Sequence, residues 1–195
     1  MANEHGKNPL GVKLRTVRES QSFSVEELAE KSKCPLELIR RIEAGELIPS
    51  LSPLLKITRA LGVRLGTLLD DAESVGPVIH RNNVESEVVR FSGEQCSVDK
   101  PQLDFFALAH NKADRHMEPF LIKVHPLTVD ERPLSSHEGE EFMYVLEGKL
   151  EIFYGKDVYT LEPGDSIYLD SVVPHNVHSA AGVETRILAL VYDPQ

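Results

Sequence analysis

Apolar residues between Leu10 and Leu69 recur three or four positions apart, the spacing that gives a helix one buried face. Ser24 followed by Glu27 forms a capping-box pattern, which predicts a helix starting near Val25. Pro35 and Gly45 lie at the two ends of the next apolar segment, the order expected of a short helix. The five helices predicted in this way lie within residues 10–21, 25–32, 33–46, 50–62 and 64–71. The short KSKCP connection after the second helix implies a steep crossing, which is a helix-turn-helix arrangement.

From residue 78 onward the pattern changes to short β-rich runs separated by Gly, Pro and Asp turns. Apolar and polar residues alternate in many of them, as in KLEIFY, where Leu150, Ile152 and Tyr154 share one face. The predicted strands lie within residues 87–91, 102–110, 119–126, 141–148, 149–155, 157–164, 166–171, 175–180 and 185–192. Strands without intervening helices favour a sandwich or a closed barrel.

Between the two patterns, the segment DAESVGP is small, acidic and ends in Gly and Pro, so we interpret residues 71–77 as a linker. The expected organisation is therefore an α+β multidomain chain. Residues 8–70 form a helical domain, and residues 78–195 form an all-β domain.

Composition and charge refine this interpretation. The net charge of −10 is uneven, because residues 1–70 carry 11 Lys and Arg against 9 Asp and Glu, whereas residues 71–195 carry 10 against 22. A mildly basic N-terminal domain is compatible with nucleic-acid binding. The chain has no run of about 20 apolar residues and no apolar signal-peptide core, so we expect a cytoplasmic protein without a membrane partner. Cys34 and Cys96 lack C-x-x-C spacing and are expected to be reduced thiols.

The segment SVEELAEKSKCPLELIRRIEAGELIPSLSPLLKITRALGV resembles the five-helix DNA-binding domain of Xre-type transcriptional regulators. The resemblance rests on the Leu28-Ala29 pair, the Ile42-Glu43 and Gly45 ending of the third helix, Pro49, and the stretch from Leu55 to Val63. It implies that the third helix enters the major groove of double-stranded DNA. The candidate contact residues are Lys33, Leu36, Glu37, Arg40 and Arg41. The alternative is that Arg40 and Arg41 are only solvated charges.

A second group of residues has the chemistry of metal ligands. His137 and Glu141 are four apart with Gly139 between them, and a bend at the glycine would let both side chains reach one ion. His175, behind Pro174, supplies a third donor, whereas His178 is expected to face the other way. Two imidazoles and one carboxylate suit Fe(II), and Mn, Ni or Zn could occupy the same site. The alternative is a structural barrel with no metal.

The same residues resemble the cupin family, whose fold is a double-stranded β-helix or jelly-roll barrel. His137, Glu141 and Gly148 fit its first motif, and Pro163-Gly164-Asp165 with Pro174-His175 fits its second. Ser135 stands where many cupins have another histidine, which leaves three candidate ligands rather than four.

An Xre-like head followed by one cupin barrel resembles bacterial regulators in which a small-molecule effector alters DNA affinity. The resemblance implies a homodimer or tetramer on a palindromic operator and no catalytic residues. The expected effector pocket is lined by Ser135, Phe106, Tyr144 and Phe153. The alternative is a mononuclear non-haem iron oxygenase of the hydroxypropylphosphonate epoxidase type, which has the same plan. Phe105, Phe106, Leu108 and Leu134 stand where that type places polar substrate-binding groups, and a phosphonate would lose hydrogen bonds there. A third hypothesis is that the barrel serves only as a scaffold or stores metal.

Overall fold

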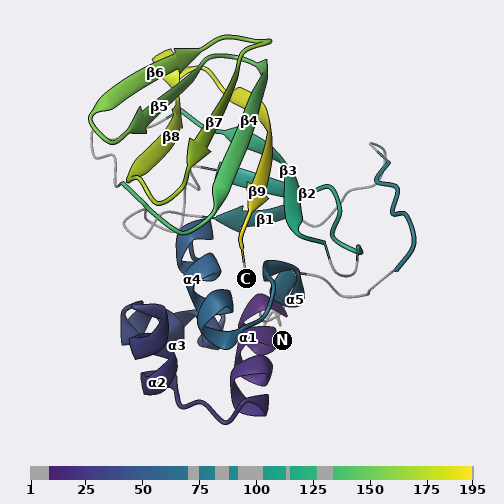
Figure 1. Ribbon diagram of the computed structural model, residues 1–195, viewed down its shortest axis with the longest axis vertical. Coiled ribbons are helices and arrows are strands. Elements are labelled where there is room, and N and C mark those ends of the chain that lie inside the picture. The colour runs from purple at the N-terminus through teal and green to yellow at the C-terminus, as the bar shows by residue number, and fades with distance from the viewer. Residues whose placement is uncertain are drawn as a thin grey trace, which may run out of the picture. The chain divides into compact units, whose positions relative to one another are not determined.

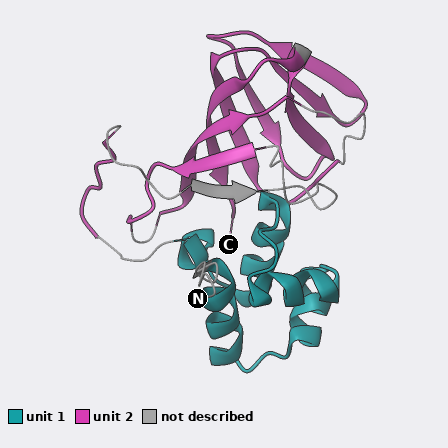
Figure 2. Cartoon of the chain, turned by 180° about the vertical axis from the view of Figure 1, so that it is seen from behind, with its two compact units in different colours: residues 1–69, 195 teal, residues 70–194 magenta. Residues whose placement is uncertain are grey.

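The computed structural model describes residues 9–69, 75–81, 88–91, 103–112, 115–126 and 134–194. The chain divides into two compact units, residues 1–69 and residues 70–194 (Figure 2). Of the linker predicted at residues 71–77, residues 71–74 lie outside the described part. No helix in the described ranges is both long enough and apolar enough to cross a lipid bilayer.

The described residues of the first unit, 9–69, form five helices (Figure 1). They are α1 (Pro9–Ser20), α2 (Val25–Ser32), α3 (Leu36–Ala44), α4 (Leu51–Leu61) and α5 (Leu65–Leu69). The predicted capping box is present, because the Ser24 hydroxyl accepts from the Glu27 amide while the Glu27 carboxylate accepts from the Ser24 amide. Gly45 ends α3 with a left-handed backbone, as its position after the apolar run predicts.

The helical core is made by one apolar stripe from each helix, and α3 shows how the stripe orients its helix. Leu38, Ile39 and Ile42 are buried, so Glu37, Arg40 and Arg41 must lie on the opposite, exposed side. Across the unit, α1 packs on α3, and α2 packs on both α3 and α4. The exposed side of α3 is therefore set by burial of its other face.

In the part of the second unit that the structure describes, the strands form two antiparallel sheets. The larger has the strand order β1-β2-β3-β9-β4-β7, and the smaller has the order β6-β5-β8. Their bounds are β1 (Val88–Phe91), β2 (Leu103–Ala107), β3 (Met117–Val124), β4 (Glu140–Glu147), β5 (Leu150–Tyr154), β6 (Asp157–Leu161), β7 (Ser166–Asp170), β8 (His175–Ser179) and β9 (Thr185–Tyr192), with a short 3₁₀ helix at Ala180–Gly182.

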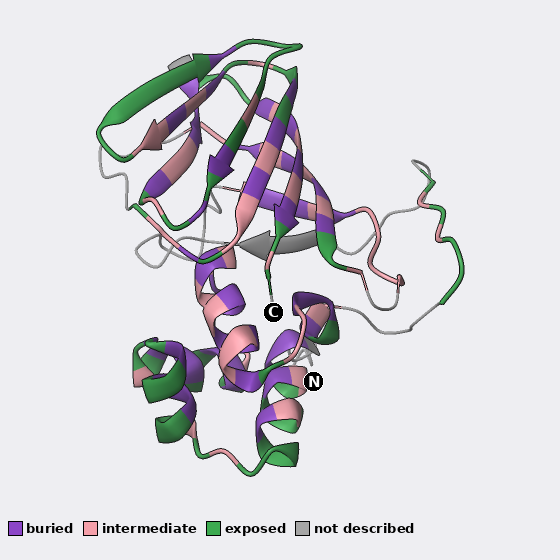
Figure 3. Ribbon diagram, in the orientation of Figure 1, coloured by how far each residue is buried: buried purple, intermediate pink, exposed green. Residues whose placement is uncertain are grey.

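Burial alternates along the long strands of the larger sheet. In β4, Glu141, Met143 and Val145 are buried and face the interior, and the intervening residues are not. Figure 3 shows this alternation of buried and less buried positions along the strands. Cross-strand pairing extends this interior row, since Val145 lies opposite Ile187 and Ile187 opposite Ile122. The predicted fold class, five helices followed by an antiparallel β-domain, is confirmed.

Candidate metal centre and nucleic-acid interface

Three buried side chains from separate parts of the β-domain converge on one point. His137 precedes β4, Glu141 is the second residue of β4, and His175 is the first residue of β8. One ligand atom from each lies within 4.8 Å of the others. His137 Nε2 is 2.7 Å from Glu141 Oε1, and His175 Nε2 is 3.6 Å from the same oxygen. The structure thus brings together the three candidate ligands that the sequence suggested.

The backbone fixes which nitrogen of each imidazole faces the centre. His137 Nδ1 lies 3.0 Å from the Glu138 carbonyl oxygen, and His175 Nδ1 lies 2.8 Å from the Val173 carbonyl oxygen. A carbonyl oxygen can only accept, so each Nδ1 carries a proton. Both Nε2 atoms therefore turn toward the Glu141 carboxylate. An unprotonated Nε2 and a carboxylate oxygen are both hydrogen-bond acceptors, so at these distances a proton or a cation must lie between them. A divalent metal would meet this requirement, and the backbone carbonyls already orient the two imidazoles toward it.

The electrostatics of the cluster keep its carboxylate charged. Burial by itself would raise the pKa of Glu141, but hydrogen bonds from His137 and His175 outweigh burial and lower its pKa to about 2. Burial favours the neutral form of His175, yet the adjacent Glu141 carboxylate outweighs it and raises the pKa of that imidazole. The Glu141 carboxylate is consequently an anionic candidate ligand at neutral pH.

Ser171 is a member of the site that sequence reasoning missed. Its hydroxyl donates to Glu141 Oε1 over 3.2 Å, and the side chain is fully buried. Its backbone accepts from the His137 amide and donates to the Gly139 carbonyl. No motif spacing marks Ser171, because these contacts arise only when β7 pairs with β4.

Gly139 provides the bend expected between His137 and Glu141. Its φ of +102° lies in the region that favours glycine, and an added Cβ would lie 2.0 Å from the Tyr192 carbonyl oxygen. Substituting Gly139→Ala must therefore displace either β9 or the bend that carries His137.

We expect Gly139→Ala to lower the free energy of unfolding of the β-domain by at least about 2 kcal/mol. Gly164→Ala is a matched control, because Gly164 also has a positive φ, +96°, but nothing lies within 4 Å of an added Cβ. It should cost about 1 kcal/mol from backbone strain alone. Urea unfolding followed by near-ultraviolet circular dichroism compares the two. Equal losses of unfolding free energy in the two variants would mean that the close approach to the Tyr192 carbonyl does not contribute to the cost.

Ser135 is the one residue of the expected effector pocket that adjoins the triad. It forms an isolated bridge with His175 in which each residue's amide donates to the other's carbonyl, at 2.9 Å in both directions. Ser135 therefore holds the segment before β4 against the start of β8.

The other expected pocket residues face away from the triad, which corrects the prediction. Tyr144 lies on the face of β4 opposite Glu141, and Phe106 belongs to the same outward row. Phe153 pairs with Asn176 rather than with His175, so it also faces away from the triad.

His178 faces away from the triad, as expected. Its ring stacks on Phe153, and its Nε2 lies 2.7 Å from the Glu151 carboxylate. The buried residues of the inward-facing rows include Phe105, Val145 and Ile152.

The candidate DNA-contact residues lie around the start and exposed side of α3. Glu37, Arg40 and Arg41 are exposed, and Leu36 is half-buried. Lys33 is exposed in the left-handed turn that ends α2. Arg40 Nη2 contacts Glu26 of α2 at 2.8 Å, whereas the Arg41 guanidinium has no ion pair with a described residue. Within the described part of the chain, Arg41 is therefore the arginine of α3 that stays available as a candidate base contact.

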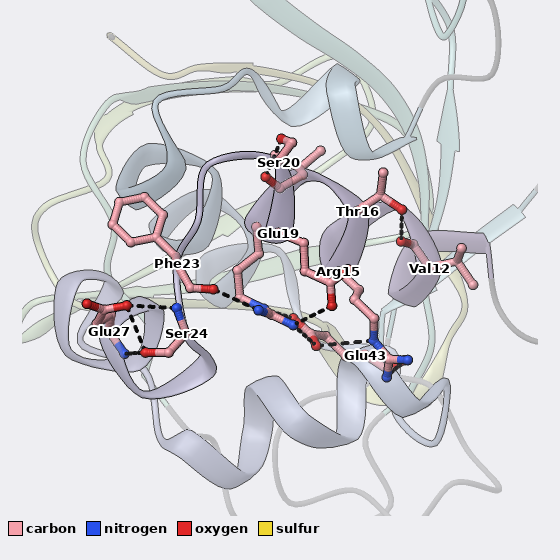
Figure 4. A network of polar contacts seen from close by, with 11 residues as sticks. Val12, Arg15, Thr16, Glu19, Ser20, Phe23, Ser24, Glu27 and Glu43 are labelled. Carbon is pink, nitrogen blue, oxygen red and sulfur yellow. Dashed lines mark hydrogen bonds and ion pairs between the residues drawn. The ribbon is translucent and has the colours of Figure 1, made fainter.

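A buried ion pair holds α3 against α1 (Figure 4). Arg18 donates to both Glu43 oxygens, from Nε at 2.6 Å and from Nη2 at 2.9 Å, and its Nη1 donates to the Phe23 carbonyl at 2.7 Å. Arg15 adds a weaker contact to the same carboxylate at 3.4 Å. Bidentate geometry of this kind fixes both distance and angle between two helices.

We expect Glu43→Gln to lower the free energy of unfolding of the helical unit by about 2–4 kcal/mol, because Arg18 would keep its charge without a buried counterion. Glu19→Gln is the control, since Glu19 contacts the same Arg18 at 3.4 Å from an exposed position. Its cost should stay below about 1 kcal/mol. Denaturation followed by helical circular dichroism measures both, and similar costs would contradict the assigned role of Glu43.

Comparisons with known proteins agree with both units. Residues 14–68 match the helix-turn-helix family model, and residues 120–191 match the cupin domain model. The HTH-type transcriptional regulator PuuR of Escherichia coli (strain K12) is 22% identical over 180 residues, covering 92% of each chain. The HTH-type transcriptional regulator SutR of the same organism is 21% identical over 186 residues, covering 95% of this chain and 96% of its own.

Solved structures share the fold. An HTH_3 family transcriptional regulator from Vibrio cholerae has a TM-score of 0.68 at 21% identity and covers 97% of each chain. Hydroxypropylphosphonic acid epoxidase from S. wedmorenis has a TM-score of 0.50 at 22% identity, covering 97% of this chain and all of its own. The family models thus assign a helix-turn-helix domain to residues 14–68 and a cupin domain to residues 120–191, and the solved structures share this two-domain fold.

Proposed function

We propose that this protein is a sequence-specific DNA-binding transcriptional regulator, and that its cupin domain senses a small molecule through a bound divalent metal. The observation that carries the proposal is that one chain has both an α3 with an exposed Arg41 and a buried His-Glu-His cluster able to hold a cation. The names of PuuR and SutR, similar over nearly the whole chain, support the regulator assignment.

The DNA contact is assigned to α3 and the turn before it. An arginine on a recognition helix can donate two hydrogen bonds to guanine, and Glu37 can accept from cytosine. Lys33 is suited to a phosphate. The neighbouring surface of α2 carries Glu26 and Glu27 in its first turn. These carboxylates repel phosphates, so we infer that binding depends on base contacts more than on non-specific charge.

The metal is assigned to His137 Nε2, His175 Nε2 and a Glu141 oxygen. A three-ligand site of this type suits Fe(II), and Mn, Ni or Zn also accept these donors. Bound in this way, the metal would keep coordination positions open for a donor atom of an effector. Ser171 and the carbonyls of Glu138 and Val173 hold the three ligands in place, and burial excludes bulk water from the donor side.

An effector regulates such a protein only if it binds one conformation better than another. We therefore propose that ligand binding at the metal changes the affinity of the helical unit for an operator, which we expect to be palindromic. The effector is a small molecule with at least one oxygen or nitrogen donor.

The proposal is tested by selecting genomic DNA fragments with the purified full chain at about 150 mM salt. The metal-free protein and protein loaded with Fe(II), Mn(II) or Zn(II) are compared, and the retained fragments are sequenced. Enrichment of one short sequence supports a regulator, and a dependence of enrichment on the metal supports sensing at the triad. Uniform retention of all fragments in every sample would contradict the proposal.

A second candidate function is a mononuclear non-haem iron oxygenase. The observation in its favour is the donor set, because two histidines and one carboxylate on one side of an ion are typical of Fe(II) enzymes that activate oxygen. The test is oxygen consumption by the Fe(II)-loaded protein with small hydroxy acids and phosphonates. Consumption that depends on substrate and is lost in His175→Ala would favour the enzyme.

A further inference from the structure

Tyr154, the last residue of β5, lies beside the triad on the inner side of the smaller sheet. It pairs directly with His175 of β8, and directly opposite residues share one face with Cβ atoms about 4.5–5.5 Å apart. It also continues the inward row of β5 after the fully buried Leu150 and Ile152. Tyr154 is half-buried whereas His175 is buried, so the phenol marks a side of the triad that solvent reaches.

The Tyr154 hydroxyl reaches across to the other sheet. Its Oη donates to the carbonyl oxygen of Asp170, the last residue of β7, over 3.2 Å. The next residue is Ser171, whose hydroxyl donates to Glu141 Oε1. The Tyr154 side chain therefore runs from the position beside one candidate ligand to the segment that holds another.

We propose that Tyr154 is a specificity-determining residue for the effector, and that its hydroxyl donates a hydrogen bond to an oxygen anion of an effector held at the triad. This inference rests on the metal-dependent sensing proposed above. The present bond of Tyr154 to the Asp170 carbonyl is a neutral one at an exposed position. A hydrogen bond to a charged acceptor is about twice as strong as a neutral one, so exchanging the carbonyl for the effector oxygen is favourable.

The charges of the site indicate the chemical class of the effector. A divalent ion carries +2, the Glu141 carboxylate −1 and the two imidazoles no charge, which leaves a charge of +1 at a buried position. Because an uncompensated buried charge is costly, a ligand with one negative charge is favoured over a neutral ligand or a dianion. A carboxylate or a hydroxamate neutralises the site and gives Tyr154 a charged acceptor. The effector is therefore assigned to monoanions with an oxygen donor.

The test compares the binding of acetohydroxamate and imidazole to the full chain loaded with Co(II). The visible absorption of Co(II) reports the atoms that coordinate it, so each ligand can be titrated at neutral pH. Acetohydroxamate binds as a monoanion and presents a charged oxygen to Tyr154, whereas imidazole binds through nitrogen and presents no acceptor there. We expect Tyr154→Phe to weaken acetohydroxamate binding by about 10-fold or more and to leave imidazole binding within about twofold of the wild type.

The matched control is Tyr144→Phe, because Tyr144 lies on the face of β4 opposite Glu141. This variant should bind both ligands like the wild type. Tyr154→Phe keeps the aromatic ring and all three candidate ligands, so its Co(II) affinity should also match the wild type. Unchanged acetohydroxamate binding in Tyr154→Phe would overturn the proposal. Equal losses for acetohydroxamate and imidazole would overturn it too, because the hydroxyl would then act only through its bond to Asp170.

The Co(II) content of the loaded protein separates this inference from the proposed function. A wild type that takes up no Co(II) would contradict the proposed metal-dependent sensing and this inference with it. A wild type that takes up Co(II) and binds imidazole but not acetohydroxamate would overturn the assigned class of effector. If the wild type binds Co(II) and acetohydroxamate and Tyr154→Phe does so equally well, only the role of Tyr154 is wrong.

Discussion

Replacing Glu141 by alanine is expected to reduce the affinity of the protein for a divalent metal by at least about 100-fold. Glu141 is the only anionic donor of the triad, and its pKa of about 2 keeps it charged at any physiological pH. Without it, two neutral imidazoles would have to hold the ion in a buried site that no longer compensates its charge. Calorimetric titration with Zn(II) or Mn(II) at pH 7 measures the change, and the metal content of purified protein provides a second readout.

The control for Glu141→Ala is Glu151→Ala. Glu151 also contacts a histidine at 2.7 Å, but His178 and Glu151 face away from the triad, so metal affinity should stay within about threefold of the wild type. Far-ultraviolet circular dichroism should be unchanged in both variants. A Glu141→Ala protein that binds metal as tightly as the wild type would place the metal elsewhere, and losses of equal size in the two variants would indicate a general effect on the β-domain.

Local signals along the chain were sufficient to predict the helical unit. The Ser24 and Glu27 capping box and the glycine at position 45 act within a few residues, so the ends they predict do not depend on the rest of the fold. The ion pair between Arg18 and Glu43 joins residues 25 apart, and no local pattern marks it.

The orientation of the β-domain strands is less visible in the sequence. Period-two alternation says which residues share a face, but it identifies the inner face only when the other face is polar. Here both faces of the larger sheet are apolar, so Phe105 and Phe106, or Tyr144 and Val145, cannot be told apart by hydrophobicity. The assignment of Phe106 and Tyr144 to a pocket was wrong for this reason.

The triad could be identified because its chemistry is unusual and its geometry is partly local. Gly139 between His137 and Glu141 permits the bend, and the structure contains it. His175 could be predicted as the third ligand because a histidine directly after a proline stands out in the sequence. Ser171 has no such neighbour in the sequence and could not be predicted. Its role depends on the pairing of β4 with β7, which brings together residues 30 apart.

Replacing Arg41 by alanine is expected to weaken binding to the selected operator by about 10- to 100-fold. A bidentate contact to a base contributes about 1–3 kcal/mol of discrimination, and Arg41 is exposed on α3 without an ion pair to a described residue. Arg40→Ala should have a smaller effect, since Arg40 already shares its charge with Glu26. Fluorescence anisotropy with the operator and with a scrambled duplex at about 150 mM salt measures both affinities.

Lys156→Ala is the charge-matched control for Arg41→Ala, because Lys156 is exposed in the turn between β5 and β6, outside the helix-turn-helix unit. It should bind the operator like the wild type. If Arg41 reads a base, its removal lowers operator affinity far more than affinity for the scrambled duplex. If it contacts a phosphate, both affinities fall together and the salt dependence becomes shallower. Unchanged operator binding would exclude Arg41 from the interface.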